Sequence, residues 1–107
     1  MKSIHRYIDS IRENIEYIVG ENASDNFYII DISKPRDIWL HIDNGASCHV
    51  IAILPENHSY DKKQLHKIAI QGGVICKQYS KYKSDKKVPV IYTELRNIEK
   101  TSKTGCV

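Results

Sequence analysis

Residues 37–43 constrain the fold more than any other part of this 107-residue chain. Isoleucine or leucine occupies every second position, so these side chains share one face while Trp39 and His41 lie on the other. A period of two is typical of a β-strand with one buried face. Asn44-Gly45 follows directly and is a strong signal for a hairpin turn. The sequence therefore predicts a hairpin whose return strand covers about residues 47–54.

The N-terminal part of the chain predicts a helix and then a short strand. Apolar residues recur at steps of three and four along the first fifteen positions and predict an amphipathic helix over residues 3–14. Residues 15–19 alternate and predict a strand that Gly20 stops. Residues 22–33 fit either a strand or a helix, because side chains with high strand propensity follow good helix N-caps.

The C-terminal part predicts a long helix and an edge strand. Residues 61–82 keep helical spacing across Gly72-Gly73, and glycines tolerated inside a helix favour close packing against another element. Residues 88–93 predict a strand, which Pro89 confines to a sheet edge or to the first positions of the strand. Residues 95–100 are expected to pair with it.

Together these elements predict one α+β domain over residues 1–107, in which helices flank a mainly antiparallel sheet with a central Asn-Gly hairpin. Residues 1–14 would form an N-terminal helical extension. Seventeen isoleucines against four leucines favour sheet, although an AT-rich genome produces the same bias.

The composition also argues against a membrane or secreted protein. The longest apolar run, residues 50–54, is far shorter than the roughly 20 residues that span a bilayer. The first residues lack an apolar secretory segment, and three irregularly spaced cysteines do not make a disulfide scaffold. We therefore expect a reducing, cytoplasmic location and no membrane partner.

The net charge of +3 hides an uneven distribution along the chain. Residues 1–59 carry five basic and nine acidic side chains, whereas residues 60–107 carry eleven basic and four acidic ones, which gives net charges of −4 and +7. Such polarisation indicates a polyanionic partner. Many of the lysines lie close together with tyrosines between them: Lys77, Lys81, Lys83, Lys86 and Lys87, with Tyr79 and Tyr82. Lysines bind phosphates and aromatic rings stack on unpaired bases, so this segment fits nucleic-acid binding, with a solubilising surface as the alternative interpretation.

Catalytic and metal sites find less support. Cys48 with His41, His49 and Asp43 could form a nucleophilic set, yet adjacent residues of a strand point to opposite faces, which separates Cys48 from His49. A two-residue turn would place His41 opposite Cys48, and a register shifted by one residue would place it opposite His49. A small buried cysteine is the expected role of Cys48. The sequence has no closed zinc spacing and no phosphate loop, so we expect no catalytic residue, no metal and no cofactor.

Several motifs resemble the NFACT RNA-binding domain, which occurs in the NFACT proteins of ribosome quality control and also in stand-alone proteins. Residues 37–41 and 47–50, D-I-W-L-H and S-C-H-V, resemble the family signature D-I-W-[FL]-H … [GS]-S-x-H-V. Residues 19–26 resemble its V-G-[RK]-N-x-x-x-N turn. Further similarity lies at residues 79–81 and 88–100, and the match is ordered along the chain from about position 15 to the end.

The resemblance implies an RNA-binding module without catalytic activity. Its expected ligand is tRNA or large-subunit ribosomal RNA, with the large ribosomal subunit as a further partner. It also implies that residues 25–32 are helical. The signature residues would either contact RNA or hold the hairpin that presents the lysines: Trp39, His41, Ser47 and His49. A structural role is implied for Gly20, Asn22, Asn26 and Asp37, the last by orienting its neighbours through their backbone N–H groups.

Two departures from the family pattern affect this expectation. Glu21 stands where the family often has a basic residue, which removes one phosphate contact. The additional domains and the coiled coil of larger members have no counterpart in this sequence, so a stand-alone domain is expected.

We predict phosphate contacts from Lys81, Lys83, Lys86 and Lys87, extended by Lys77, Arg96 and Lys100. A DNA-binding module, or a protein-interaction adaptor for an acidic partner, would use the same basic face.

Overall fold

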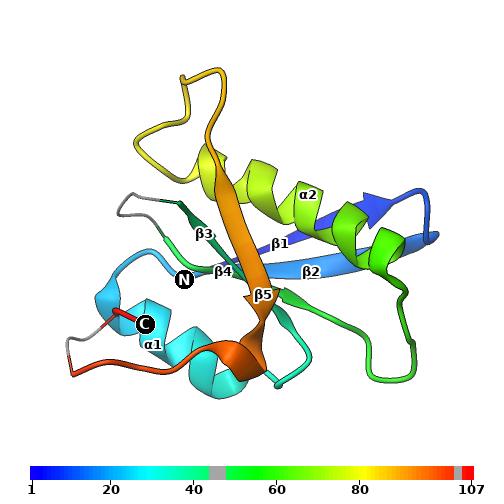
Figure 1. Ribbon diagram of the computed structural model, residues 1–107, viewed down its shortest axis with the longest axis horizontal. Helices are drawn as coiled ribbons and strands as arrows, with labels where there is room; N and C mark the ends of the chain where they lie inside the picture. The colour runs from blue at the N-terminus through cyan, green and yellow to red at the C-terminus, as the bar shows by residue number, and fades with distance from the viewer. Residues whose placement is uncertain (44–47, 103–104) are drawn as a thin grey trace.

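The computed structural model describes residues 1–43, 48–102 and 105–107. Five antiparallel strands form one sheet in the order β1-β2-β4-β3-β5 (Figure 1). The strands are β1 (Lys2–Ile8), β2 (Glu13–Val19), β3 (Ile38–Ile42), β4 (Val50–Ile53) and β5 (Val90–Glu94). The helices are α1 (Ala23–Ile32) and α2 (Lys62–Gln78), and a 3-10 turn covers Leu95–Asn97. The prediction of an α+β fold with an antiparallel sheet is confirmed.

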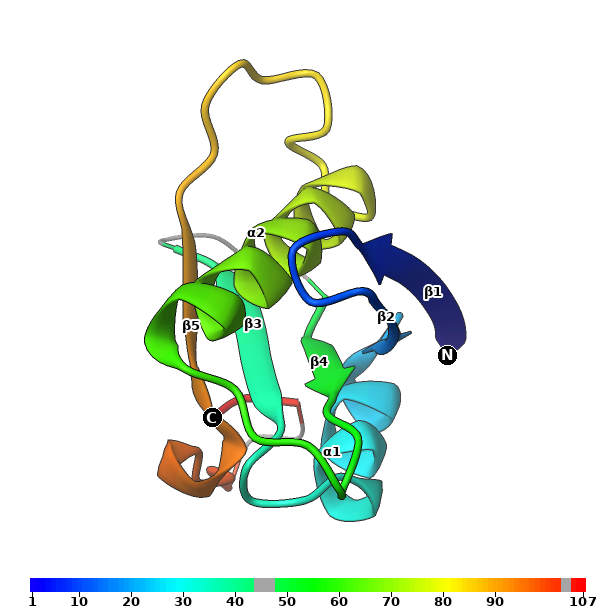
Figure 2. The ribbon, with the colours of Figure 1, turned by 90° about the vertical axis from the view of Figure 1, so that its right-hand side faces the viewer.

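The two faces of the sheet bury two separate clusters of apolar side chains. Helix α2 crosses one face and contributes Ile68, Ala69, Ile75 and Cys76 to the larger cluster. Helix α1 and the 3-10 turn lie on the opposite face, where Ile29 and Leu95 pack around Trp39 (Figures 1 and 2). The alternation predicted for β3 is therefore confirmed, because its aliphatic residues face α2 while Trp39 faces α1. No helix within the described ranges is long and apolar enough to cross a bilayer.

The prediction of a helix over residues 3–14 is wrong, because β1 occupies most of this segment and pairs with β2. Ile4 and Ile8 are four positions apart, which places them on one face of a helix but also on one face of a strand. The burial of β1 alternates as a strand requires, with His5 and Tyr7 exposed. The chain then reverses at Arg12, whose φ of 54° lies in the left-handed region that tight turns use. Residues 1–14 are thus an edge of the sheet and not a helical extension.

Strands β3 and β4 pair in the register shifted by one residue from that of a two-residue turn. Trp39 is opposite Ile51 and Leu40 is opposite Val50, so His41 faces His49 across the pair instead of Cys48. Strand β4 begins at Val50, later than the predicted return strand at 47–54. The predicted Asn44-Gly45 turn lies outside the described residues.

Helix α2 begins with a capping box, in which the Asp61 carboxylate accepts the Gln64 N–H at 2.8 Å and the Gln64 side chain accepts the Asp61 N–H at 2.9 Å. It ends at Gln78, before the predicted limit at 82. A Cβ atom on Gly72 would come within 2.8 Å of a Leu40 methyl group, so the predicted close packing is confirmed there. Gly73 has only an ordinary contact, 3.8 Å from Val90.

Strand β5 lies at a sheet edge, as Pro89 predicted, but residues 95–100 do not pair with it. The buried Leu95 donates its N–H to the Asp37 carbonyl at 2.7 Å, and Arg96 donates to the Pro35 carbonyl at 2.9 Å. These bonds tie the chain to the loop before β3. The prediction failed because this stabilisation comes from residues distant in sequence.

Candidate nucleic-acid interface

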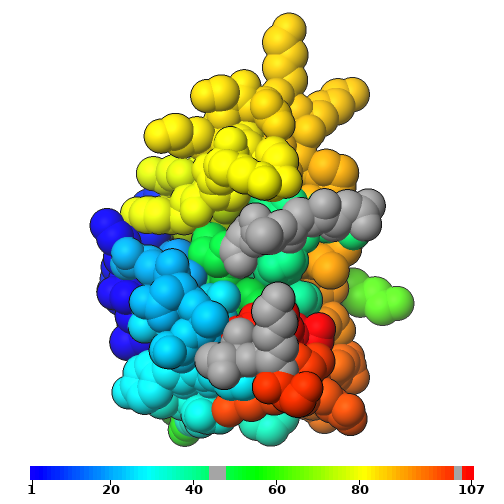
Figure 3. All heavy atoms as spheres, turned by 90° about the vertical axis from the view of Figure 1, so that its left-hand side faces the viewer, coloured from blue at the N-terminus to red at the C-terminus, as the bar shows by residue number. Residues whose placement is uncertain are grey.

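The loop between α2 and β5 projects from the body of the domain (Figure 2). Its four lysines are all exposed: Lys81, Lys83, Lys86 and Lys87. Asp85 is the single acidic residue among them. We call residues 81–87 the basic loop. None of the ion pairs between described residues involves these four lysines, so their ammonium groups are available to an external anion. Figure 3 shows the loop at one end of a face that also carries the start of α1 and part of the C-terminal segment.

Backbone hydrogen bonds hold the loop at both ends. After the end of α2, the Ser80 hydroxyl accepts the Tyr82 N–H at 3.1 Å. The backbone carbonyl of Tyr82 accepts the Asp85 N–H at 3.0 Å. At the other end, Asp43 donates its N–H to the Pro89 carbonyl at 2.9 Å. The Lys81 ammonium lies 5.3 Å from the centre of the Tyr82 ring, within cation–π range. The arrangement presents four positive charges beside a partly exposed aromatic ring.

The other predicted basic contacts divide into two groups. Lys77 lies in the last turn of α2, close to the basic loop, and is half-buried. Arg96 follows the far end of β5 and pairs with Glu94 at 2.6 Å. Lys100 lies 2.5 Å from the Asp31 carboxylate, with its ammonium 4.9 Å from the centre of the Phe27 ring. Lys77 therefore lies next to the loop, whereas the segment that carries Arg96 and Lys100 follows the opposite end of β5 (Figure 1).

The aromatic signature residues form one cluster on the α1 side of the sheet. Trp39 stacks on His41 with ring centres 5.6 Å apart and planes 3° from parallel. His49 meets both rings edge-on, at 5.3 Å and 5.2 Å. Trp39 is 5% exposed and His49 is 3% exposed, whereas His41 is half-buried. Ser47 lies outside the described residues.

Burial decides the charge of this cluster. It lowers the pKa of His49 to about 4, with a smaller contribution from the neighbouring His41, so the His49 ring is neutral at pH 7. The Trp39 Nε1 and His49 Nδ1 atoms are buried without a hydrogen-bond partner. The His41 Nδ1 atom lies 2.7 Å from the Ile42 carbonyl. A buried neutral ring does not make a charged phosphate contact, so of the three described rings only His41 is placed to meet a ligand.

The backbone of His49 is fixed by the glycine-asparagine motif that precedes and opens α1. Gly20 donates its N–H to the His49 carbonyl at 2.9 Å, and the Asn26 side chain accepts the His49 N–H at 3.2 Å. A Cβ atom on Gly20 would overlap the Asn26 Oδ1 atom. Asn22 caps α1 by accepting the Asp25 N–H at 2.8 Å. The periodicity of the sequence did not indicate this link, and the resemblance of residues 19–26 to the family turn was its only signal.

Asp37 is 1% exposed and holds the chain on both sides of β3. One carboxylate oxygen accepts the Lys34 N–H at 2.8 Å, and the other accepts the Leu54 N–H at 2.9 Å. The carboxylate thus joins the turn before β3 to the end of β4, as the implied role in orienting backbone N–H groups requires. Buried charge is tolerated here because each oxygen has a backbone donor.

Cys48 lies on the α2 side of the sheet, away from the aromatic cluster. Its sulfur is 4.0 Å from the Cys76 carbonyl, and the Cys76 sulfur is 3.8 Å from the Cys48 carbonyl. Contact with Cys76 lowers the pKa of the Cys48 thiol. Because His41 and His49 face α1, the Cys–His pair required for a nucleophilic site is not formed. Within the described ranges no three His, Cys, Asp or Glu side chains are grouped to hold a metal ion.

Comparison with known proteins identifies this arrangement. The family model described as the NFACT protein RNA binding domain matches residues 4–107. The Rqc2 homolog RqcH of Bacillus subtilis (strain 168) is 30% identical over 84 residues, which cover 78% of this chain but only 14% of that protein. The C-terminal part of the fibronectin/fibrinogen-binding protein from Streptococcus suis has the same fold, with a TM-score of 0.73 at 19% identity over 94% of this chain and 39% of that chain. The chain belongs to the NFACT RNA-binding domain family.

Proposed function

We propose that this domain binds RNA without catalysing a reaction and that the basic loop provides the main phosphate contacts. The proposed ligands are tRNA and large-subunit ribosomal RNA, in ribosome-associated quality control or translation in the cytoplasm. Family membership supports RNA binding, and the similarity to RqcH supports the quality-control context. The chain spans about a seventh of that relative, so the activity of the whole relative is not transferred.

One observation carries the proposal: four exposed lysines project on a loop without intramolecular ion pairs among the described residues. Lysines held in salt bridges must lose them before they bind phosphate, whereas free lysines gain counterion-release energy directly. Tyr82 offers a ring for an unpaired base next to these charges. An RNA loop or a single-stranded end, which presents both phosphates and unstacked bases, matches this combination best.

The aromatic cluster has a supporting role in this proposal. Trp39 and His49 are buried, and their rings fix the inner side of the β3–β4 pair. Of the three described rings only His41 is partly exposed, and its backbone lies two residues before Asp43, which donates its N–H to the Pro89 carbonyl at the end of the loop segment. We assign Trp39 and His49 to holding the hairpin and His41 to the rim of the RNA-binding surface.

A charge-reversal experiment tests the proposal. Labelled tRNA is titrated with the wild-type chain and with a variant in which all four loop lysines become glutamate, and fluorescence anisotropy reports binding. We expect binding to be lost while the far-ultraviolet circular dichroism and the melting temperature are unchanged, because all four side chains are exposed. Unchanged tRNA affinity in this variant would refute the electrostatic argument.

The same α2 helix provides a matched control. Lys62 and Lys63 are exposed in its first turn, whereas the loop follows its last turn. Lys62→Glu with Lys63→Glu should weaken binding much less than Lys81→Glu with Lys83→Glu, although the net charge changes equally. Equal losses would mean that the net charge and not the loop attracts RNA. Competition with a ribosomal RNA fragment and with double-stranded DNA of equal length then ranks the proposed ligands.

A further inference from the structure

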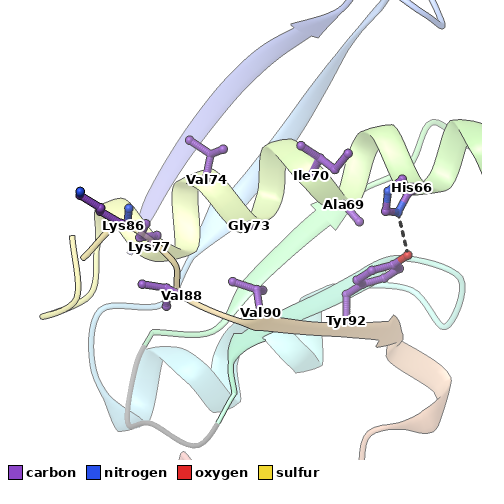
Figure 4. Close-up of a pocket in the computed structure, with 10 residues that line it drawn as sticks. All are labelled: His66, Ala69, Ile70, Gly73, Val74, Lys77, Lys86, Val88, Val90 and Tyr92. Carbon is purple, nitrogen blue, oxygen red and sulfur yellow. Dashed lines mark hydrogen bonds between the residues drawn. The ribbon is translucent and has the colours of Figure 1, made fainter. Parts of the chain in front are cut away.

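A second surface, separate from the aromatic cluster, lies between α2 and β5 (Figure 4). It is a groove of about 360 Å³ whose walls are mainly aliphatic. Helix α2 contributes Ile70 and Val74, which are 43% and 52% exposed, and the β5 side contributes Val88 and Val90. Large aliphatic side chains this exposed and this close together are unusual on a surface that stays in water.

The polar groups of the groove lie at its two ends. Lys77 and Lys86 stand at the end near the basic loop, and the His66 ring lies 3.2 Å from the Tyr92 hydroxyl at the other end (Figure 4). None of the described residues that line the groove is acidic. A complementary ligand would therefore be apolar along most of its length and negatively charged at the lysine end.

The backbone of β5 adds hydrogen-bonding groups along this groove. Pro89 accepts a hydrogen bond from Asp43, so its carbonyl faces β3. Because backbone groups alternate in direction along an antiparallel strand, the N–H and C=O groups of Val90 and Tyr92 point to the outer side. No other strand of the described residues pairs there, since β5 ends the sheet. The same two residues line the groove with their side chains.

We propose that this groove binds an extended peptide of a partner protein, which pairs with the outer edge of β5 as a sixth strand. Alternate aliphatic side chains of that peptide would fill the space beside Ile70 and Val74, and an acidic residue would meet Lys77 and Lys86. Strand addition of this kind gains affinity from backbone hydrogen bonds and specificity from pockets for alternate side chains.

The lining favours a peptide over RNA in this groove. Bases stack on aromatic rings, but most of the walls here are valine, isoleucine and alanine, and the rings of Tyr92 and His66 lie together at one end with the Tyr92 hydroxyl 3.2 Å from His66. The residues that usually protect an edge strand, lysine or an inward-pointing charge, are absent between Val90 and Thr93. The edge from Val90 to Thr93 is uncharged and adjoins apolar surface, which fits a partner strand, and the charge of Glu94 at the end of β5 is paired with Arg96.

The test uses the full chain and no RNA, so that its failure leaves the RNA-binding proposal untouched. A phage-displayed library of random linear peptides is selected on the immobilised chain, and the strongest binders are synthesised. We expect sequences with aliphatic residues at alternate positions and at least one aspartate or glutamate. Two series of peptides are then compared, one methylated at the backbone nitrogens of odd positions and the other at those of even positions. Only one series should lose binding, because only one edge of the peptide faces β5.

Matched variants locate the binding site. Val74→Asp should weaken peptide binding at least about tenfold, whereas Ile32→Asp, at a similarly exposed position on α1, should leave it unchanged. No enrichment of alternating sequences, or equal loss in both N-methyl series, would overturn the proposal. So would a dimer in light scattering that Val74→Asp dissociates, since a second copy would then occupy the groove. A loss of tRNA affinity in Val74→Asp as large as that of the charge-reversed loop would assign the groove to RNA instead.

Discussion

The contact between Gly20 and Asn26 gives a quantitative prediction about how the domain is held together. In Gly20→Ala, the new methyl group would overlap the Asn26 Oδ1 atom and come within 3.1 Å of the Asn26 backbone nitrogen. The side chain of Asn26 must then move away from the His49 N–H that it accepts. The φ angle of Gly20 is not in the left-handed region, so the expected cost comes from this contact and not from backbone strain.

The magnitude follows from two contributions. A buried N–H left without its acceptor costs about 1–3 kcal/mol. Forcing an extra methyl group into a packed site adds about 1–3 kcal/mol. We therefore expect Gly20→Ala to lower the free energy of unfolding by about 3 kcal/mol, a large part of the stability of a small domain. Asn26→Ala, which removes only the acceptor, should cost about 1–3 kcal/mol.

The double variant separates this explanation from general damage. Once Asn26 is alanine, the methyl group at position 20 no longer meets an oxygen, so the second substitution should cost much less than it does alone. Urea unfolding followed by the fluorescence of Trp39, the single tryptophan of the chain, gives all four free energies of the cycle. We expect a coupling of about 2 kcal/mol between the two positions. Additive costs would refute the contact as the cause.

Three further predictions concern stability, salt and pH. Gly73→Ala should raise the free energy of unfolding by about 1 kcal/mol, because alanine favours the helix and its methyl group would meet only Val90, at 3.8 Å. Gly72→Ala should lower the free energy of unfolding by about 1 kcal/mol or more, because its methyl group would overlap Leu40. Equal melting temperatures for the two variants would contradict this packing. The logarithm of tRNA affinity should fall with the logarithm of salt concentration at a slope of about −2.8 to −3.6, as four phosphate contacts require. Filter binding should therefore show a loss of roughly 50- to 150-fold between 50 and 200 mM salt, and a slope near zero would exclude a charge-driven interface. Folding lowers the pKa of His49 from about 6.5 to about 4, so the contribution of the neutral ring to stability is complete above pH 6.5 and declines as the pH falls toward 4. We therefore expect urea unfolding to show a loss of about 2 kcal/mol between pH 7 and pH 5. An unchanged urea midpoint would show that the ring is not held neutral.

The sequence predicted those parts of the fold whose signal is local. The alternation around Trp39 was sufficient for β3, and the spacing of residues 61–82 was sufficient for α2, although that helix ends at Gln78. The first residues were misassigned because Ile4 and Ile8 satisfy a helix and a strand equally, and only pairing with β2 decides between them. Residues 22–33 were ambiguous because side chains with high strand propensity follow good helix N-caps, and the family resemblance was needed to expect the helix found there.

The candidate site likewise contains features that the sequence predicted and features that it did not. The basic loop was visible as a cluster of lysines, since exposed charge needs no partner to be recognised. The burial of His49 could not be predicted from the sequence, because this burial depends on Gly20 and Asn26, which approach His49 only in the folded chain. Arg96 was grouped with the loop lysines by charge alone, whereas the length of β5 separates them.

The strand order has a consequence for how the chain folds. Two pairings among the described strands join segments close in sequence, β1 with β2 and β3 with β4, whereas β2 must wait for β4, where Glu16 meets Ile53, and β3 must wait for β5, where Ile42 meets Val90. An isolated two-stranded hairpin is at best marginally stable in water. Pairings between segments this distant in sequence also slow folding relative to a helical protein of similar size. A nascent chain is therefore expected to complete its sheet only after β5 and the buried Leu95 that follows it have been synthesised.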